Sequence, residues 1–255
     1  MSSSDGQVHG QGSDELPRGG VGTLYGVGVG PGDPELLTLK AVRILGSVSV
    51  IFVPVARPGA PSYAAMIIAA HVDPTRQRIT ELVFAMREDA AAMAAQWEVN
   101  ARIILEQLHT GADAAFATEG DPMLYSTFSH VAGAVAELEP RVPIVYVPGI
   151  SSINAVAAAA GLPLGDRDER IAILPATYAT GELREALASY DTVVLLKIAS
   201  ALEPVLDTLD ELGLIGQAVC VRRCGRPEQE IVRDVRALRG RDLDYFSTMI
   251  VRQAP

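Results

Sequence analysis

The chain has 255 residues, of which 49 % are hydrophobic and 20 % charged, and its formal net charge is −10. This length suits two medium domains, and the acidity, with no basic run among aromatic residues, excludes a nucleic-acid partner. No apolar run is long enough to span a bilayer, and two cysteines cannot form a disulfide framework, so we expect a soluble, cytoplasmic protein.

The first twenty residues differ in composition from the rest of the chain. Residues 1–20 are rich in Ser, Gly and Asp and contain no apolar segment. Such a segment cannot bury enough surface to become ordered, and it lacks the apolar stretch of a signal peptide, so we expect a disordered tail. After it we predict an N-terminal α/β domain over residues 21–149 and a C-terminal α/β domain over residues 150–255.

From residue 23 onward, short apolar runs alternate with segments of helical periodicity. Strands are predicted at 23–28, 48–53, 79–83, 114–117 and 143–147, and helices at 35–46, 61–71, 88–110, 125–138 and 151–160. Because these strands are nearly continuous apolar runs, they are typical of a parallel sheet covered by helices on both faces.

A second set of elements follows the charged connector 165–170. Strands are predicted at 171–174, 192–197, 217–222, 229–233 and 248–252, with helices at 181–189 and 201–212. The last strands have little helix between them, which favours a mixed sheet over a second parallel one. The expected fold class is therefore α/β, with a parallel N-terminal sheet and a mixed C-terminal sheet.

A glycine-rich loop, Gly-Val-Gly-Val-Gly-Pro-Gly-Asp-Pro at 26–34, ends the first predicted strand. Glycine allows positive φ and close approach of the backbone, and the carboxyl end of a first strand is where open α/β sheets bind small molecules. The loop is not a dinucleotide fingerprint. Asp33 stands where the third glycine belongs, and the apolar run 50–54 stands where the ribose-binding acid belongs.

Four further loops follow predicted strands, at 118–128, 147–152, 195–200 and 220–230. In the first of these, Glu119 and Asp121 flank a glycine, where they could accept hydrogen bonds from a ligand or face a cation. Asp121 also fits the start of a helix, with Pro122 in its first turn. The serines of the next loop are helix caps or ligand contacts, and residue types alone leave both readings open.

Taken in order, these motifs resemble the tetrapyrrole (corrin and sirohaem) methyltransferases that use S-adenosylmethionine. The resemblance covers residues 22–252 and rests on Gly-x-Gly-Pro-Gly-Asp-Pro-x-Leu-Leu-Thr, Glu-Gly-Asp-Pro-x-x-Tyr-Ser-Thr-Phe, Pro-Gly-Ile-Ser-Ser and the last strand Tyr-Phe-Ser-Thr-Met-Ile-Val-Arg. Glu119-Gly120-Asp121 and the loop Arg-Cys-Gly-Arg-Pro-Glu-Gln look most like the members that methylate C20 of precorrin-2. The Gly-Gly-Asp-Pro-Phe of the sirohaem branch is absent.

The resemblance implies a homodimer that holds S-adenosylmethionine in a cleft between the two domains, methylates C20 of precorrin-2 to give precorrin-3A in cobalamin biosynthesis, and releases S-adenosylhomocysteine. The cofactor-binding residues carried over by motif are Pro31, Glu119, Gly120, Asp121, Leu124, Tyr125, Ser126, Thr127, Ser151, Ser152, Lys197 and Gly225. Three alternatives stay open: the cobalt-loaded ring of the anaerobic pathway (cobalt-factor II), another position of the corrin ring, and a binding module without turnover.

The predicted chemistry needs a base and a cationic trough. Glu119 and Tyr125 are the two candidates for the base that removes the C20 proton. Because precorrin-2 is a polycarboxylate and arginine pairs with carboxylates bidentately, substrate contacts are expected from arginines in predicted loops: Arg57, Arg222, Arg223 and Arg226. The four histidines and two cysteines lack the spacing of metal ligands, so no metal site is expected.

Overall fold

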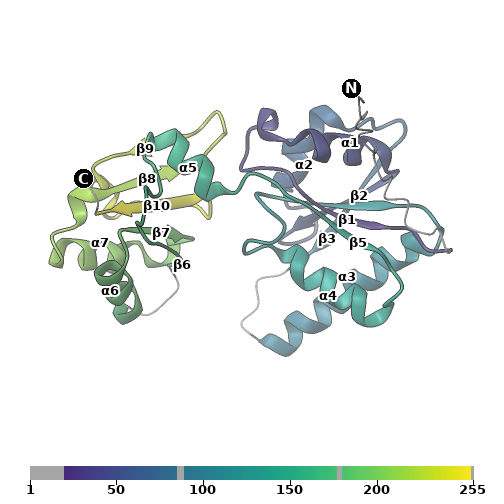
Figure 1. Cartoon of the computed structure of the whole chain (residues 1–255). Coiled ribbons are helices and arrows are strands. Elements are labelled where there is room, and N and C mark those ends of the chain that lie inside the picture. Colours follow the sequence, from purple (N-terminus) through teal and green to yellow (C-terminus); the bar gives the residue numbers. More distant parts are fainter. Residues whose placement is uncertain (1–19, 85–88, 177–179, 254–255) are drawn as a thin grey trace, which may run out of the picture.

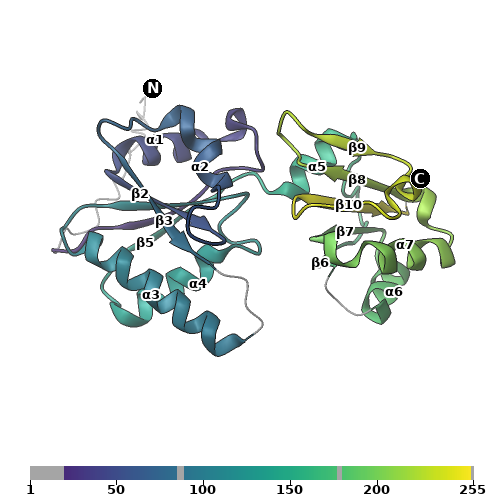
Figure 2. The same cartoon turned by 180° about the vertical axis from the view of Figure 1, so that it is seen from behind.

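The computed structural model describes residues 20–84, 89–176 and 180–253 and places them in two α/β domains (Figures 1 and 2). Except for Gly20, the predicted N-terminal tail lies outside the described residues. No helix of the described part is long and apolar enough to cross a membrane.

The N-terminal domain is built on a parallel sheet, as its apolar strands predicted. Its strands are β1 (Leu24–Gly28), β2 (Val50–Val55), β3 (Arg78–Val83), β4 (Ala114–Thr118) and β5 (Ile144–Val147), in the order β3-β2-β4-β1-β5. This order places β1 between β4 and β5, so the loops that follow these three strands meet at one edge of the sheet.

Helices cover both faces of this sheet and close two apolar cores. Helices α1 (Leu39–Ser47) and α2 (Tyr63–Ile68) pack on one face, and α3 (Ala90–Leu108) and α4 (Thr127–Leu138) pack on the other (Figure 1). The inner strands β1, β2 and β4 are buried on both sides because each face has its own helical layer, which explains why they read as nearly continuous apolar runs.

The C-terminal domain is built on a mixed sheet, also as predicted. Its strands are β6 (Ile171–Pro175), β7 (Thr192–Leu196), β8 (Ala218–Arg222), β9 (Glu230–Val232) and β10 (Ser247–Arg252), in the order β6-β7-β10-β8-β9. Strands β6 and β7 are parallel, whereas β10 pairs antiparallel with β7 and β8, and β9 pairs antiparallel with β8.

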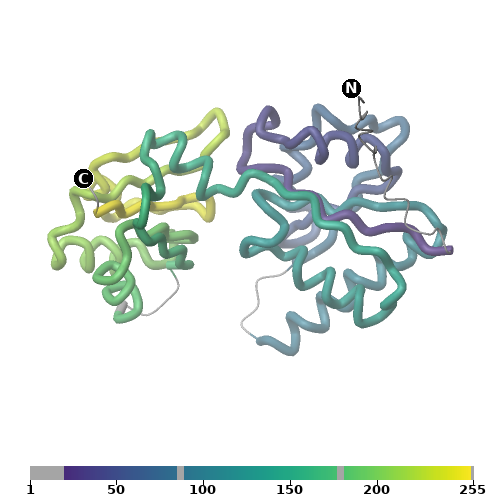
Figure 3. The backbone as a smooth tube through the Cα atoms, viewed as in Figure 1, coloured from purple at the N-terminus to yellow at the C-terminus, as the bar shows by residue number. Residues whose placement is uncertain are grey.

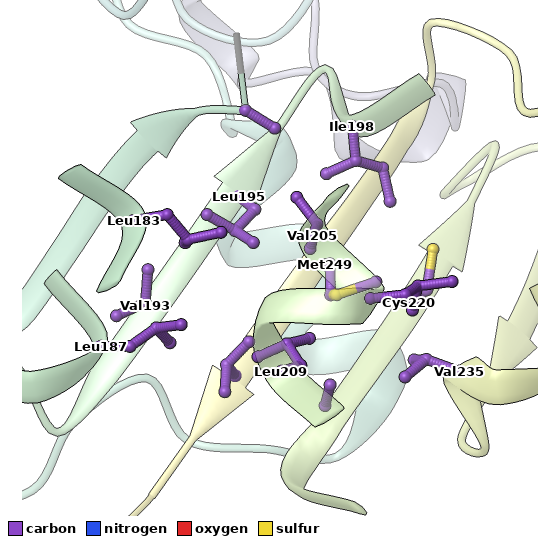
Figure 4. Packing of buried hydrophobic residues seen from close by; sticks show 14 of the residues in the cluster. Leu183, Leu187, Val193, Leu195, Ile198, Val205, Leu209, Cys220, Val235 and Met249 are labelled. Atoms are coloured by element: carbon purple, nitrogen blue, oxygen red, sulfur yellow. The ribbon is translucent and has the colours of Figure 1, made fainter. Parts of the chain in front are cut away.

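One face of this second sheet packs on α6 (Thr180–Ser189) and α7 (Leu202–Glu211), with Leu195, Leu209 and Met249 in the core between them (Figure 4). The other face packs on α5 (Ser152–Ala160). The chain therefore passes from the first sheet to the second between β5 and α5, along residues 148–151 (Figure 3).

Several predicted helices begin later than their periodicity indicated. The predicted helix 35–46 is instead a 3₁₀ turn, Pro34–Leu36, followed by α1, because Leu37 is extended and the Thr38 side chain caps the Ala41 N–H. The predicted helix 125–138 begins at Thr127, where Ser126 is the N-cap. Short 3₁₀ helices also occur at Ala69–His71, Ile198–Ala201, Ile215–Gln217 and Val235–Leu238.

The predicted helix 88–110 begins at Ala90, and Asp89 caps it by accepting a hydrogen bond from the Ala91 N–H. Glu88, the first residue of that prediction, lies outside the described residues.

Candidate functional site

The loops after β1 and β4 form one hydrogen-bonded floor. Beyond β1, the Val29 N–H donates to the Thr118 carbonyl at 2.9 Å. Gly30 and Gly120 then exchange backbone hydrogen bonds, 2.7 Å from the Gly120 N–H to the Gly30 carbonyl and 3.3 Å in the other direction. The glycine-rich loop and the Glu119 loop are therefore fixed to each other beyond the ends of their strands.

The loop after β5 packs on this floor so closely that it has no space for a side chain. A Cβ atom on Gly149 would lie 2.1 Å from the Gly120 carbonyl oxygen and 2.7 Å from the Gly28 carbonyl carbon. Contacts this short are incompatible with a methyl group, so glycine is required where the three loops meet. Gly28 of the first loop therefore serves the packing of backbone against backbone.

Asp121 ties the second loop to the third. Its Oδ2 accepts a hydrogen bond from the Gly149 N–H at 3.0 Å, and its Oδ1 accepts one from the Met123 N–H at 2.9 Å. The structure thus corrects the sequence-based alternative that Asp121 starts a helix, since Ser126 caps α4 instead. The Asp121 carboxylate therefore holds the second and third loops together.

A cavity opens above this floor and is lined by residues of both domains. Its lining consists of Pro31, Glu119, Gly120, Asp121, Leu124, Tyr125, Ser151, Ser152, Val156, Leu196, Lys197, Cys224, Tyr245, Phe246 and Thr248. Apolar walls with a few polar groups are typical of small-molecule sites.

Residues with left-handed backbones lie at the cavity lining or next to it in the chain. Tyr125 (φ 51°), Lys197 (φ 57°) and Arg223 (φ 49°) all lie in a region that residues with side chains rarely occupy. Such a conformation costs on the order of 1 kcal/mol or more and persists only where contacts enforce it. The Tyr125 hydroxyl donates to the Ile173 carbonyl at 3.4 Å, from the first domain to β6 of the second.

Glu119 is the most perturbed carboxyl group at the cavity. Burial raises its pKa from 4.5 to about 7, while the positive charge of Arg226 acts in the opposite direction. The Arg226 Nη2 lies 3.4 Å from the Glu119 Oε2. A carboxyl group with a pKa near neutrality can both accept and release a proton at physiological pH.

Most of the predicted cofactor-binding residues lie together at the cavity. Nine of the twelve line it: Pro31, Glu119, Gly120, Asp121, Leu124, Tyr125, Ser151, Ser152 and Lys197. Three lie outside the lining. Ser126 is buried and its hydroxyl accepts from the Phe128 N–H, Thr127 is the first residue of α4, and Gly225 packs against Asp33.

The four predicted substrate arginines have different surroundings. Arg57 is exposed in the turn after β2, with no ion pair among the described residues. Arg222 forms an ion pair with Glu230 at 2.5 Å, and its Nε is buried without a hydrogen-bond partner in the described part of the chain. Arg223, with 43 % of its side chain exposed, donates from Nε to Asp244 at 2.5 Å.

Arg226 is the fourth predicted substrate arginine, and it is nearly buried between the two domains. Its side chain is only 12 % exposed, and its guanidinium lies over the rings of Tyr63 and Phe246, at 4.2 Å and 3.9 Å from their centroids. It therefore reaches from the C-terminal domain to Tyr63 and Glu119 of the N-terminal domain.

Sequence reasoning assigned no site role to six lining residues: Val156, Leu196, Cys224, Tyr245, Phe246 and Thr248. The last three lie in the Tyr-Phe-Ser-Thr segment that carried the resemblance, so this motif could have identified them as site residues. Val156 and Leu196 are ordinary core positions of a helix and a strand, and only the packing of the two domains places them at the cavity. Lys197 Nζ lies 5.5 Å from the centre of the Tyr245 ring.

Among residues 20–84, 89–176 and 180–253, no group of three or more His, Cys, Asp or Glu side chains has the geometry of a metal site. Cys220 and Cys224 are both buried free thiols, and burial raises the pKa of both, that of Cys220 to about 12. Neither thiol is therefore ionised at neutral pH.

The sequence matches the family model of the Tetrapyrrole (Corrin/Porphyrin) Methylases over residues 23–237. It is 40 % identical to the "Probable cobalt-precorrin-2 C(20)-methyltransferase" of Methanocaldococcus jannaschii, over 78 % of this chain and 84 % of the relative. It is 31 % identical to the cobalt-precorrin-2 C(20)-methyltransferase of Salmonella typhimurium, over 91 % of this chain and 97 % of the relative. It is 30 % identical to the precorrin-2 C(20)-methyltransferase of Sinorhizobium, over 91 % of this chain and 96 % of the relative.

Solved structures share the fold. A cobalt precorrin-4 methyltransferase aligns over 91 % of this chain and 96 % of its own, with a TM-score of 0.67 and 21 % identity. The uroporphyrin-III C-methyltransferase of Thermus thermophilus, complexed with S-adenosylhomocysteine, aligns over 91 % and 98 %, with a TM-score of 0.60 and 23 % identity.

Proposed function

Because this chain belongs to the tetrapyrrole methylase family, we propose that it transfers a methyl group from S-adenosylmethionine to C20 of precorrin-2, giving precorrin-3A in cobalamin biosynthesis. The observation that carries the proposal is the cavity between the domains, where nine residues predicted from motifs in four separate segments come together. The C20-methyltransferase relatives match this chain over most of their length.

The residues present fit S-adenosylmethionine as the methyl donor. The cavity combines the carboxylate of Glu119 with the hydroxyls of Ser151 and Ser152 and the apolar side chains of Leu124 and Val156, which suits a ligand that has both polar and apolar parts. When bound, S-adenosylmethionine supplies an electrophilic methyl group. The protein holds the donor in line with the reacting carbon and excludes water, so orientation supplies much of the rate enhancement.

Glu119 is our choice for the base that removes the C20 proton. Its pKa of about 7 is close to the optimum for a general base at physiological pH. The other candidate, Tyr125, is held by its hydroxyl contact with Ile173 on the opposite domain. We assign to Tyr125 the role of closing the cavity.

The carboxylates of the tetrapyrrole need cations at the mouth of the cleft. Arg57 and Arg223 fit this role, because Arg57 is exposed, Arg223 is partly exposed beside its ion pair with Asp244, and both lie in loops that follow strands of the two sheets. Arg223→Ala should raise the KM for the tetrapyrrole and leave the affinity for S-adenosylhomocysteine unchanged. Unaltered kinetics would make Arg223 an ordinary surface charge.

The metal content of the substrate is the finer point of the proposal, because the relatives include both metal-free and cobalt C20-methyltransferases. The deciding experiment is anaerobic incubation with labelled S-adenosylmethionine and either precorrin-2 or its cobalt-loaded counterpart, followed by mass spectrometry and carbon NMR. We expect label at C20 of the metal-free ring. Turnover with the cobalt form alone would place the enzyme in the anaerobic pathway, and label at another carbon would contradict the C20 assignment.

The homodimer and the cytoplasmic location that the resemblance implied belong to the same proposal. The two free, buried cysteines fit a reducing compartment. Light scattering of the purified protein tests the dimer, and a molar mass near 27.0 kDa, that of one chain, would contradict it.

A further inference from the structure

The loop between β8 and β9 docks on the glycine-rich loop of the other domain. A Cβ on Gly32 would lie 2.7 Å from the Cys224 carbonyl oxygen and 2.9 Å from the Arg226 Cγ. A Cβ on Gly225 would lie 2.9 Å from the Asp33 N. The two loops therefore touch through backbone, and this contact carries the Arg226 side chain to the N-terminal domain.

The Arg226 guanidinium occupies an aromatic slot made by both domains. Tyr63, the first residue of α2, lies on one domain and Phe246 on the other, and their ring centroids are 4.3 Å apart in an edge-to-face arrangement. Both rings lie within 4.2 Å of the guanidinium carbon. Arginine stacked on aromatic rings gains cation–π attraction while its edge stays free to donate hydrogen bonds.

That edge points to Glu119, which lines the cavity, whereas Arg226 itself does not. No other hydrogen bond or ion pair to the Glu119 carboxylate occurs among the described residues, so Arg226 is its one polar partner there. Because only 12 % of the Arg226 side chain is exposed, its guanidinium is poorly placed to pair with a carboxylate of the substrate.

We propose that Arg226 is a positioning residue for the methyl donor: it joins the two domains beside the cavity and holds the Glu119 carboxylate at the cavity wall. This inference rests on the proposed function, because it takes the cavity to be the donor site. It gives Arg226 a different role from the substrate contact that the sequence predicted.

The test is a double-mutant cycle on S-adenosylhomocysteine affinity, measured by calorimetry with the full chain. Arg226→Gln and Glu119→Gln should each weaken binding about tenfold, as expected for loss of a charge-assisted contact. The double variant should lose no more than the worse single variant, because the two residues act as one unit. Arg141→Gln, which breaks an exposed pair with Glu139, is the matched control and should bind like the wild type.

Kinetics distinguish this role from a purely structural one. At saturating donor, Arg226→Gln should leave the KM for the tetrapyrrole unchanged, and Arg226→Lys, which keeps the charge, should restore part of the donor affinity. If Arg226→Gln does not fold, Tyr63→Leu removes one face of the slot without touching the cavity and should weaken donor binding about threefold.

Three results would overturn the inference: additive losses in the cycle, unchanged donor affinity in Arg226→Gln or Tyr63→Leu, or a raised tetrapyrrole KM in Arg226→Gln with normal donor affinity. A wild-type protein that does not bind S-adenosylhomocysteine would instead refute the proposed function itself, so the two failures are distinguishable.

Discussion

Glu119 is the residue whose ionisation should make the stability of this protein depend on pH. Its pKa is about 7 in the folded protein and near 4.5 in the unfolded chain, so the folded state binds more protons between these values. Stability should therefore fall as the pH rises from 4.5 to 7, by about 2 kcal/mol after allowance for partial exposure to solvent. Glu119→Gln cannot ionise and should lack this component.

Urea unfolding of the wild type and Glu119→Gln at pH 4.5 and pH 7.5 measures the contribution of Glu119. This contribution is the difference between the two proteins in how their free energy of unfolding changes with pH. Other titrating groups contribute equally to both and cancel. Parallel stability profiles would show that the folded protein does not hold this carboxyl group in its neutral form.

Asp121 should contribute to folding as well as to the site, because both of its oxygens accept backbone hydrogen bonds. Asp121→Asn replaces one acceptor by an amide donor and leaves the N–H of Met123 or Gly149 unpaired. We expect a loss of about 1–2 kcal/mol in the free energy of unfolding. The exposed Glu98→Gln, which breaks a surface pair with Arg102, should change it by less than about 0.5 kcal/mol. Equal effects of the two changes would contradict this role.

At the scale of elements, the junction of the loops after β1, β4 and β5 has no space for a side chain. Gly149→Ala should therefore destabilise the protein by about 3 kcal/mol or more, because backbone atoms on two sides would have to move. Gly133→Ala in α4 is the matched control. Its Cβ would meet nothing within 4 Å, and alanine favours a helix by about 0.5–1 kcal/mol, so this variant should be more stable than the wild type.

Thermal unfolding of both glycine variants measures the two effects with opposite signs. If Gly149→Ala unfolded at the wild-type temperature, the three loops would not be packed as the structure describes. The contrast also separates glycines that the tertiary structure requires from glycines that it tolerates.

At the scale of the whole molecule, a ligand bound between the domains should stabilise both. S-adenosylhomocysteine at a hundred times its Kd should add about 2.7 kcal/mol and raise the melting temperature by roughly 5–10 °C. Hydrogen exchange should slow together in residues 119–125 and 223–229, which belong to different domains. Protection confined to one domain would place the ligand outside the shared cavity.

Much of this architecture follows from local sequence. Short, mostly apolar runs identified the ten strands that the structure describes, and the loops after them contained the nine predicted cofactor-binding residues that line the cavity. Local pattern was less informative about where helices begin, because a capping side chain or a left-handed residue can delay the start. Periodicity continued the first helix across Leu37, but the Thr38 cap begins it later, and the left-handed Tyr125 delays α4 to Thr127.

By itself, the sequence determined the fold class, the family and the loops that line the site, because hydrophobic periodicity and turn residues act over a few positions. Only the tertiary structure decided what each polar group contacts. Arg226 and Glu119 are 107 residues apart, and nothing local to either indicates the other. Their pairing, the aromatic slot around the guanidinium and the raised pKa of Glu119 exist only because docking of the two domains removes these groups from water.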